Sequence, residues 1–536
     1  MSAIKKADRI HPEVILEAYE RNAGNVKRTA KELGIGSWTV LRNVRKLGKG
    51  KKPIAGGRVK AKLETAELPK TGEVKRYILT SAQNNTHRHE GIWRNLLALA
   101  AHYDATILIG TYSYNQNAYG ELAVKRGTKK PSEKELWYDE ELKPYFSDTR
   151  VKLGDGLVWC GEFNALPTAT NPLSGLESYS ERKSTIFPHA KMAMRSIPTM
   201  LDAPAKLIFT TGTVTKMNYI QKRAGTIAEH HHVYGAVLVE VNAAGKWWVR
   251  QLNAESRGGK IQDLDVIVDD GIITTGNRVE AITWGDLHAT FADDEVVEVS
   301  LDMLDTLRPK TQFMHDVLEG SSINHHRKDD PHFKFMTWLR GLNRVAEEMK
   351  RTAALMDRYD RPETKTVVVE SNHDNPWIQR WLRDYDFKKD PPNAQFYLKA
   401  QVYMYEELAK KKMPRDISML EWCLKEVGLK STPKFLIADE SYRICDDKIE
   451  CGMHGHLGPG GSQGTPSNLS KMGRRCNIAH THQAGIYDGL YMAGTTSKLR
   501  WSYNQGPSNW THSHVVTYPN GKRTIITIFA GAWRAR

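Results

Sequence analysis

A run of three β-branched residues, Val367 to Val369, is followed by a polar corner that carries Asn372, His373 and Asp374. Consecutive β-branched residues predict a buried strand. In α/β proteins, ligands bind at the carboxyl ends of such strands. This stretch therefore predicts an α/β fold with a functional site at one edge of its sheet.

Clusters of oxygen and nitrogen ligands recur along the chain, each at an expected strand end or loop: Asp286 with His288, Asp316, His454 with His456, and His480 with His482. A carboxylate and an imidazole two positions apart after a strand can both turn toward one ion, so such pairs suit a divalent metal. A single Asp-x-His pair arises by chance in many proteins. The ordered set, however, indicates a metal centre.

The order of these clusters resembles that of the calcineurin-like metallophosphoesterase superfamily, and is most similar to its Mre11/SbcD-like DNA nuclease branch. The match extends from Glu280 to about His482. It implies a metallophosphoesterase-type β-sandwich flanked by helices, forming a catalytic domain over residues 272–536. The chain departs from the family at His315, Ser371 and Ala479, where the family has glycine.

The resemblance also implies two divalent metal ions that share one carboxylate. The implied ligands of the first ion are Asp286, His288, Asp316 and His482, and those of the second are Asp316, Asn372, His454 and His480. His373 would be a catalytic residue near the scissile phosphate, and His456 is a second choice for His454. Ligands of this mixture without cysteine favour Mn²⁺, with Fe²⁺, Zn²⁺ or Mg²⁺ as alternatives.

The positive charge of the chain is concentrated at its N-terminus. Residues 1–60 contain 15 Lys and Arg against 5 Asp and Glu, whereas the whole chain of 536 residues has a formal charge of +15. A basic arm of this kind is typical of nucleic-acid binding. A solubilising tail is the alternative.

Three short helical patterns lie within residues 1–48, at residues 11–21, 26–33 and 38–47, separated by glycine-containing turns. The arrangement resembles a Fis-type helix-turn-helix. This resemblance implies DNA contacts from the third helix, through Arg42, Asn43, Arg45 and Lys46. A small helical bundle that binds a protein is the alternative.

Residues 49–75 are rich in glycine and lysine and have no sustained apolar period, which predicts a basic flexible linker.

Residues 76–271 predict a separate α/β module of unknown role, with a β-α-β unit and a later hairpin. Adjacent histidines in a strand point to opposite faces, so we do not expect His230, His231 and His232 to share a metal ion. Residues 334–357 predict an amphipathic helix with one apolar stripe.

These patterns predict a two-metal DNA nuclease that hydrolyses phosphodiester bonds with a metal-activated water. The metal core would carry out the hydrolysis, and the basic helices would bind the polymeric substrate. One alternative is a phosphatase or phosphodiesterase acting on a small nucleotide or phosphoprotein, with a regulatory DNA-binding module. Another is a DNA-binding regulator built on an inactive core.

No apolar run reaches the roughly 18 residues of a membrane span, and the N-terminus lacks an apolar signal core. We therefore expect a cytoplasmic protein with no membrane partner. The five cysteines are scattered without CxxC spacing, which predicts reduced thiols. The resemblance is also compatible with a homo-oligomer.

Overall fold

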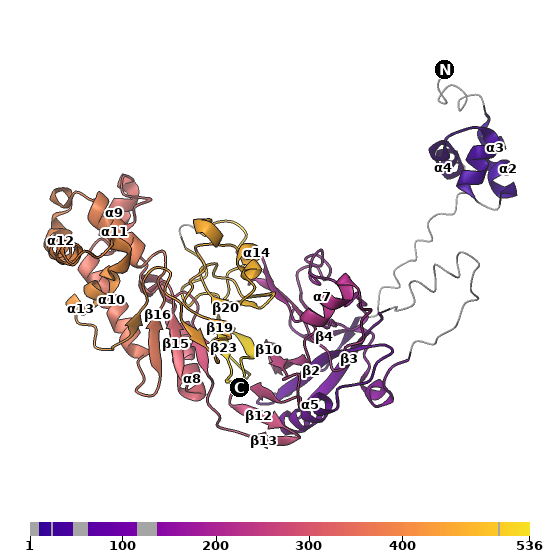
Figure 1. The fold of residues 1–536 in the computed structure, drawn as a ribbon, viewed down its shortest axis with the longest axis horizontal. Helices are drawn as coiled ribbons and strands as arrows, with labels where there is room; N and C mark the ends of the chain where they lie inside the picture. Colours follow the sequence, from indigo (N-terminus) through magenta and orange to yellow (C-terminus); the bar gives the residue numbers. More distant parts are fainter. Residues whose placement is uncertain (1–9, 23–24, 47–62, 115–136, 502–503, 536) are drawn as a thin grey trace. The chain divides into compact units, whose positions relative to one another are not determined.

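The computed structural model describes residues 10–22, 25–46, 63–114, 137–501 and 504–535 (Figure 1). The chain divides into two compact units, Met1–Lys62 and Leu63–Arg536. Among the described residues, none of the helices has the length and apolar character needed to span a bilayer.

The smaller unit contains the helices α2 (Pro12–Arg21), α3 (Val26–Leu33) and α4 (Ser37–Lys46), close to the three predicted ranges. The side chain of Asn25 caps α3 by accepting a hydrogen bond from the Arg28 N–H at 3.1 Å. The three helices enclose a small apolar core formed by Ile15, Leu16, Ala30, Ile35, Val40 and Val44. The helical prediction for this region is confirmed.

The linker prediction is wrong for its second half, and residues 49–62 lie outside the described residues. Strand β1 (Leu63–Thr65) pairs in parallel with β4 (Arg150–Gly154), and β2 (Val74–Gln83) begins before residue 76. All three side chains of β1 are exposed. An edge strand of this kind leaves no apolar period in the sequence.

The larger unit is a mixed α/β fold whose described strands form four sheets. The eleven-stranded sheet has the order β1, β4, β5 (Leu157–Cys160), β6 (Ser184–Phe187), β8 (Lys206–Thr210), β7 (Met194–Ile197), β21 (Gly485–Tyr487), β22 (Leu490–Met492), β20 (Arg475–Ile478), β19 (Ile449–Glu450) and β18 (Arg443–Ile444). The six-stranded sheet has the order β17 (Lys434–Phe435), β16 (Lys365–Val368), β15 (Thr311–Met314), β14 (Ala281–Thr283), β23 (Ser513–Thr517) and β24 (Arg523–Thr527).

Two smaller sheets complete this unit. The four-stranded sheet has the order β10 (Trp247–Asn253), β9 (Gly235–Asn242), β2 and β3 (Ala105–Tyr112), and the three-stranded sheet consists of β11 (Ile261–Asp263), β12 (Val266–Asp269) and β13 (Ile272–Thr274). Strands β2 and β3 are parallel and flank α5 (Glu90–Tyr103), and β9 pairs antiparallel with β10. The predicted β-α-β unit and hairpin are both confirmed.

Residues 76–271 do not form a separate compact unit. Their strands share the eleven-stranded sheet with strands from residues 443–492, through the antiparallel pairing of β7 with β21 at Arg195 and Gly485. The predicted boundary at residue 271 therefore falls inside one unit. A pairing between positions so far apart leaves no local signal in the sequence.

Strands β14, β15, β16 and β17 run parallel, so their carboxyl ends meet at one edge of the six-stranded sheet. The predicted strand residues Val367, Val368 and Val369 are all buried. Helices pack against this sheet around one apolar core: α8 (Asp294–Leu307), α10 (Val345–Arg358), α11 (Asn375–Asp384), α12 (Ala394–Ala409) and α13 (Met419–Glu426).

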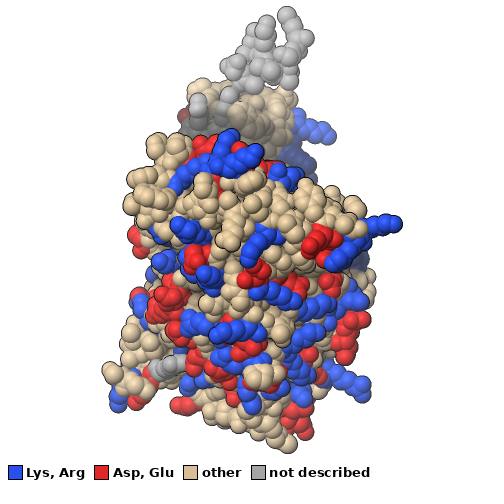
Figure 2. All heavy atoms as spheres, turned by 90° about the vertical axis from the view of Figure 1, so that its left-hand side faces the viewer, with Lys and Arg blue, Asp and Glu red and all other residues tan. Residues whose placement is uncertain are grey.

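The prediction of one helix over residues 334–357 is wrong. The chain forms α9 (Pro331–Leu339) and α10, and Gly341 lies between them with a φ of 66°. The side chains of Phe335 and Trp338 on α9 are 57% and 60% exposed. On the face that carries α9 and α12, basic and acidic side chains are interspersed (Figure 2), so it offers no surface of a single charge for a polyanion.

Candidate metal centre

Two sheets deliver the seven candidate ligands to one place. Asp286, Asp316 and Asn372 follow the parallel strands β14, β15 and β16 of the six-stranded sheet, while His480 and His482 follow β20 of the eleven-stranded sheet. The Asn477 side chain on β20 donates hydrogen bonds to the hydroxyls of Thr283 on β14 (3.3 Å) and Thr517 on β23 (3.0 Å). These bonds hold the two sheets in register at the site.

The first donor group consists of Asp286, His288 and His482, all of them buried. The Nε2 atom of His482 lies 2.9 Å from Oδ2 of Asp286 and 3.0 Å from Nε2 of His288. Three ligand atoms of different residues thus converge on one small volume.

The second donor group consists of Asp316, His454 and His480. The Nε2 atom of His454 lies 3.1 Å from Oδ2 of Asp316 and 3.0 Å from the side-chain oxygen of Asn372. The structure therefore places the Asn372 side chain next to this group.

Both donor groups fit a divalent metal ion. Ligand atoms about 2.1 Å from an ion lie about 3 Å apart when neighbouring bonds meet at right angles. The four distances between donor atoms, 2.9 to 3.1 Å, agree with this spacing. In addition, Oδ2 of Asp286 is buried, and its 2.9 Å contact with Nε2 of His482 does not have the geometry of a hydrogen bond. A cation would satisfy that oxygen.

Asp316 lies between the two groups. Its Oδ2 atom is 3.1 Å from Nε2 of His454 and 3.9 Å from Nε2 of His288. Its Oδ1 atom accepts a hydrogen bond from the His373 N–H at 3.0 Å. One carboxylate therefore faces the donors of both groups, which is the arrangement that a bridging ligand needs.

Four of the candidate ligands have left-handed backbones, with φ of 42° at His288, 38° at Asp316, 70° at His480 and 56° at His482. Such conformations are uncommon for residues other than glycine, and they concentrate at functional sites where the surrounding structure holds them. These backbone conformations are independent of the ligand distances. They support a functional site whose residues are held in place by the surrounding structure.

The protonation states of the histidines suit metal binding, with one exception. Burial lowers the pKa of His288 well below its usual value and the pKa of His480 to about 4, so both imidazoles are neutral. Burial alone would lower the pKa of His454, but Asp316 and Asp286 raise it to about 9. A metal ion must displace that proton, so metal binding should weaken as the pH falls.

His373 borders the site and is partly exposed. Its Nδ1 atom lies 2.8 Å from the carbonyl oxygen of Glu319, and its ring stacks on Trp377 with the centroids 4.1 Å apart. These two contacts fix the ring, so that Nε2 lies on the side of the ring away from the Glu319 carbonyl. His373 also forms a third donor group with His288 and Glu319, so the geometry allows it to act as a ligand.

The positions where glycine is replaced have structural roles. The Ser371 hydroxyl accepts a hydrogen bond from the Asp316 N–H at 3.0 Å and donates one to the Val369 carbonyl at 2.9 Å. His315 stacks on His454 with ring centroids 5.5 Å apart. His456 belongs to neither donor group, and its ring centroid is 5.4 Å from that of His454.

The predicted DNA-contacting residues lie in α4 of the smaller unit, apart from the metal centre in the sequence. The side chain of Asn43 donates a hydrogen bond to the Thr39 carbonyl at 2.9 Å, which places it along its own helix. The side chains of Arg42, Arg45 and Lys46 lie outside the described residues.

Comparison with known proteins finds a similarity to a phage protein over most of the chain. No protein-family model matches the chain. The chain is 34% identical over 498 residues to protein A1 of Escherichia phage T5, and the aligned region covers 90% of this chain and 86% of that protein. Because the smaller unit spans only residues 1–62, the aligned region covers most of the larger unit.

Glu319 is a site residue that the sequence analysis missed. Its Oε2 atom lies 3.1 Å from Nδ1 of His288, and its side chain is almost fully buried. Burial, together with the charges of Glu348 and Asp316, raises the pKa of Glu319 well above its usual value. A carboxyl group behind a ligating imidazole fixes the ring and its tautomer. In the sequence, Glu319 is a single glutamate three residues after Asp316, and no motif distinguishes it from other glutamates.

We expect Glu319→Gln to lower the affinity for Mn²⁺ by about 10- to 100-fold, because partners that orient a metal-bound histidine contribute that much. Equilibrium dialysis of the purified chain measures the affinity. Glu347→Gln, which alters an exposed residue of α10, is the matched control and should bind normally. An unchanged affinity in Glu319→Gln would show that His288 does not depend on Glu319.

Proposed function

We propose that this chain, which belongs to the family of protein A1 of Escherichia phage T5, is a two-metal DNA nuclease of the metallophosphoesterase type. The observation that carries the proposal is the pair of donor groups, in which Asp316 of the second group also faces His288 of the first. Each group has two imidazoles and a carboxylate oxygen, and Asn372 lies beside the second group. This arrangement supports the ligand set that the resemblance implies.

When bound, two divalent metal ions would supply the chemistry of phosphodiester hydrolysis, because such a pair clamps the reacting oxygens and lowers the pKa of a bound water. We infer that the ions are Mn²⁺. The chain's own contribution is to hold the donors rigidly and to keep the carboxylates ionised. Burial alone would raise the pKa of Asp316, but His454 and His373 lower it well below its usual value.

His373 is proposed as the catalytic residue that acts on the phosphate. The contact of Nδ1 with the Glu319 carbonyl makes Nδ1 the protonated nitrogen of the neutral ring. Protonation of Nε2 would then give a donor that can stabilise the charge on the phosphate or protonate the leaving oxygen.

Two features support DNA as the substrate over a phosphoprotein. The smaller unit is a basic three-helix bundle, and we propose that it is a helix-turn-helix in which α4 contacts DNA. Beside the metal centre, the partly exposed rings of Trp501 and Trp510 approach His288 and His482, with centroids 4.9 and 4.0 Å apart. Aromatic rings at this position can stack on nucleotide bases.

The fold proposal is that the six-stranded sheet and the β18–β22 part of the eleven-stranded sheet form the metallophosphoesterase β-sandwich. The contacts of Asn477 with Thr283 and Thr517 support this pairing of sheets. The helices on the six-stranded sheet would then be the flanking layer.

The activity is tested by incubating the full-length chain and Mn²⁺ with plasmid DNA, single-stranded DNA and a chromogenic phosphodiester. We expect cleavage of DNA, and we expect Asp316→Asn to abolish it while Asp384→Asn, at an exposed site on α11, retains it. Hydrolysis of the small ester without any DNA cleavage would instead support a phosphodiesterase. No hydrolysis of any substrate would support an inactive core.

We expect His373→Ala to reduce turnover by about 10² to 10⁴, the usual contribution of general acid-base catalysis, while Mn²⁺ content and DNA affinity stay near normal. Steady-state cleavage and metal analysis of the same preparation measure both quantities. The control is His332→Ala, at an exposed histidine on α9. Loss of metal together with activity would make His373 a ligand, and retained turnover would remove its catalytic role.

Deleting residues 1–60 should weaken DNA binding and flatten its salt dependence, because each lost phosphate contact reduces the slope of log K against log salt by about 0.9. Hydrolysis of the chromogenic ester should persist, since the metal centre lies in the other compact unit. Fluorescence anisotropy at several salt concentrations measures the change. An unaltered affinity and slope would contradict the DNA-binding role of the helices.

A further inference from the structure

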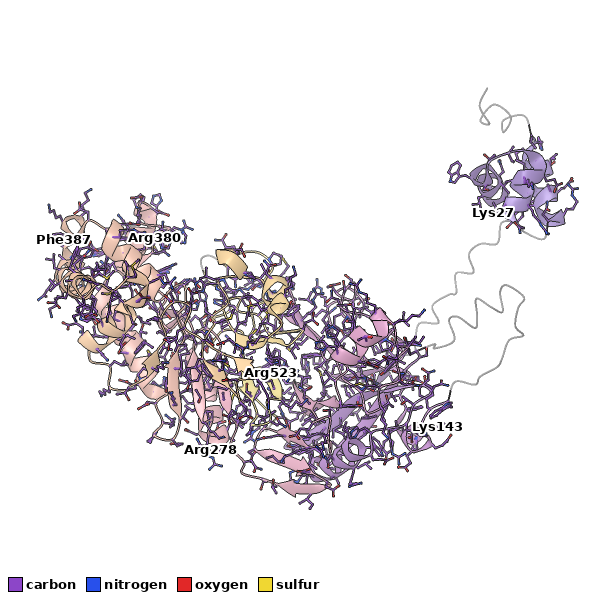
Figure 3. All side chains as sticks on the ribbon, viewed as in Figure 1. Lys27, Lys143, Arg278, Arg380, Phe387 and Arg523 are labelled. Atoms are coloured by element: carbon purple, nitrogen blue, oxygen red, sulfur yellow. The ribbon has the colours of Figure 1, made fainter. Side chains whose placement is uncertain are left out.

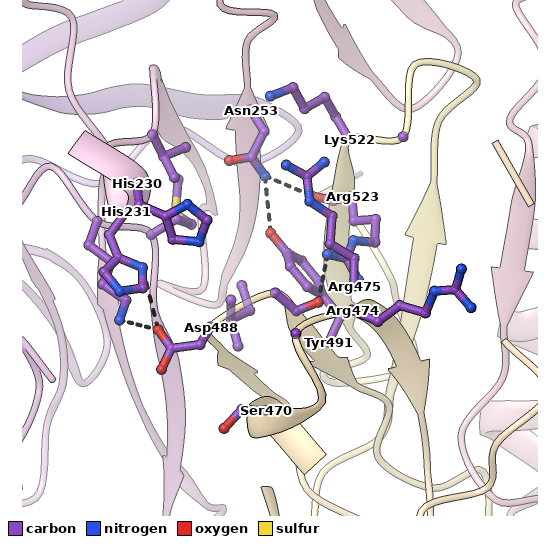
Figure 4. Close-up of a pocket in the computed structure, with 17 residues that line it drawn as sticks. His230, His231, Asn253, Ser470, Arg474, Arg475, Asp488, Tyr491, Lys522 and Arg523 are labelled. Atoms are coloured by element: carbon purple, nitrogen blue, oxygen red, sulfur yellow. Dashed lines mark hydrogen bonds and ion pairs between the residues drawn. The ribbon is translucent and has the colours of Figure 1, made fainter. Parts of the chain in front are cut away.

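Apart from the candidate metal centre, the larger unit contains a polar cavity with a volume of about 460 Å³. Segments distant in the sequence meet around it. His230 and His231 come from α7 (Arg223–His231), so they lie in a helix and not in the strand that the sequence analysis assumed. Figure 4 shows these histidines and Asp488 on one side, with Arg475, Lys522 and Arg523 across from them.

The lining of the cavity is strongly basic. Five lysine and arginine side chains contribute to it: Lys191, Arg474, Arg475, Lys522 and Arg523. The single carboxylate in the lining, Asp488, is already paired with Lys191 and lies 3.6 Å from Nδ1 of His231. The wall therefore has an excess of positive charge that its own acidic residue does not neutralise.

Arg523 is a buried cation without a carboxylate partner among the described residues (Figure 3). Its guanidinium donates hydrogen bonds to the carbonyls of Cys476 (2.9 Å) and Gly489 (2.8 Å) and to the side-chain oxygen of Asn477 (3.0 Å). It also lies over the ring of Tyr491, 4.1 Å from the centroid. Neutral acceptors orient the guanidinium but leave its charge uncompensated, which is costly in a buried position.

Lys522 and Arg475 complete the cationic wall. The Nζ atom of Lys522 and the guanidinium of Arg475 form neither a hydrogen bond nor an ion pair with any described residue, and Lys522 is only partly exposed. Burial and the neighbouring Arg475 lower the pKa of Lys522. Glu255, whose charge raises the pKa of Lys522, accepts a hydrogen bond from Asn520 at 3.0 Å. An anion in the cavity would compensate all three cations.

The cavity and the metal centre lie toward opposite ends of one strand. β20 begins at Arg475, which lines the cavity, and its chain continues to the ligand His480. None of the seven candidate metal ligands lines the cavity. The cavity is therefore a separate site.

We propose that this cavity binds a phosphate-bearing small molecule of nucleotide size, through Arg475, Lys522 and the buried charge of Arg523. Arginine and lysine are the side chains that recognise phosphate oxygens. The volume lies within the range of about 300 to 1,000 Å³ that is typical of small-molecule sites. Asn253 and Ser470 add neutral polar groups for the rest of the molecule. This site does not depend on the proposed nuclease activity.

Isothermal titration calorimetry of the full-length chain with deoxyadenosine monophosphate, inorganic phosphate and deoxyadenosine tests the proposal. We expect the monophosphate to bind and the uncharged nucleoside not to bind. Arg475→Ala and Lys522→Gln should each weaken binding by about tenfold or more, since each removes a charge-assisted bond to phosphate. Both positions are near the surface, and a thermal melt of each variant verifies its fold.

Two control variants locate the binding. Lys448→Ala, at an exposed lysine outside the cavity, and His482→Ala, at the metal centre, should both bind the monophosphate normally. Equal affinity for inorganic phosphate would identify free phosphate as the ligand, and tighter binding of the monophosphate would identify an organic phosphate. The proposal is overturned if the monophosphate does not bind, if the nucleoside binds equally well, or if only His482→Ala loses binding.

Discussion

The structure of the candidate site depends on one buried carboxylate, that of Asp316, placed between imidazoles from two donor groups. A buried carboxylate is costly unless positive charge and hydrogen bonds surround it. Here the Ser371 hydroxyl fixes the Asp316 backbone and the His373 N–H binds its second oxygen. These contacts hold the carboxylate in place before any ion arrives, which is the preorganisation that catalysis by metal ions needs.

Assembling this environment requires two sheets. The parallel strands β14 to β16 deliver the carboxylates and the amide at one edge, and β20 delivers two imidazoles from the other sheet. Left-handed backbones at four ligands then turn their side chains inward. The same strand, β20, begins at the second, cationic cavity. One strand thus contributes to the candidate metal centre at one end and to the proposed anion site at the other.

The sequence was informative wherever a property is local. The order of ligands at strand ends, the β-branched run before Asn372 and the three N-terminal helices can all be read from neighbouring residues. The sequence was uninformative where distant segments meet. The pairing of β7 with β21 merges the predicted separate module into one unit, and Glu319 contacts His288 only after β14 and β15 have paired. The break at Gly341 was missed because apolar residues continue on both sides of it. The roles of the ligands and of α4 stay predictions.

The central claim is that the two donor groups hold two ions with Asp316 between them. Its most direct test is the number of Mn²⁺ ions bound per metal-depleted full-length chain, measured by equilibrium dialysis with metal analysis at neutral pH. The account predicts two ions in the unaltered chain, one ion in His482→Ala, and weakened binding of both ions in Asp316→Asn. A single ion in the unaltered chain, or two tightly bound ions in Asp316→Asn, would contradict it.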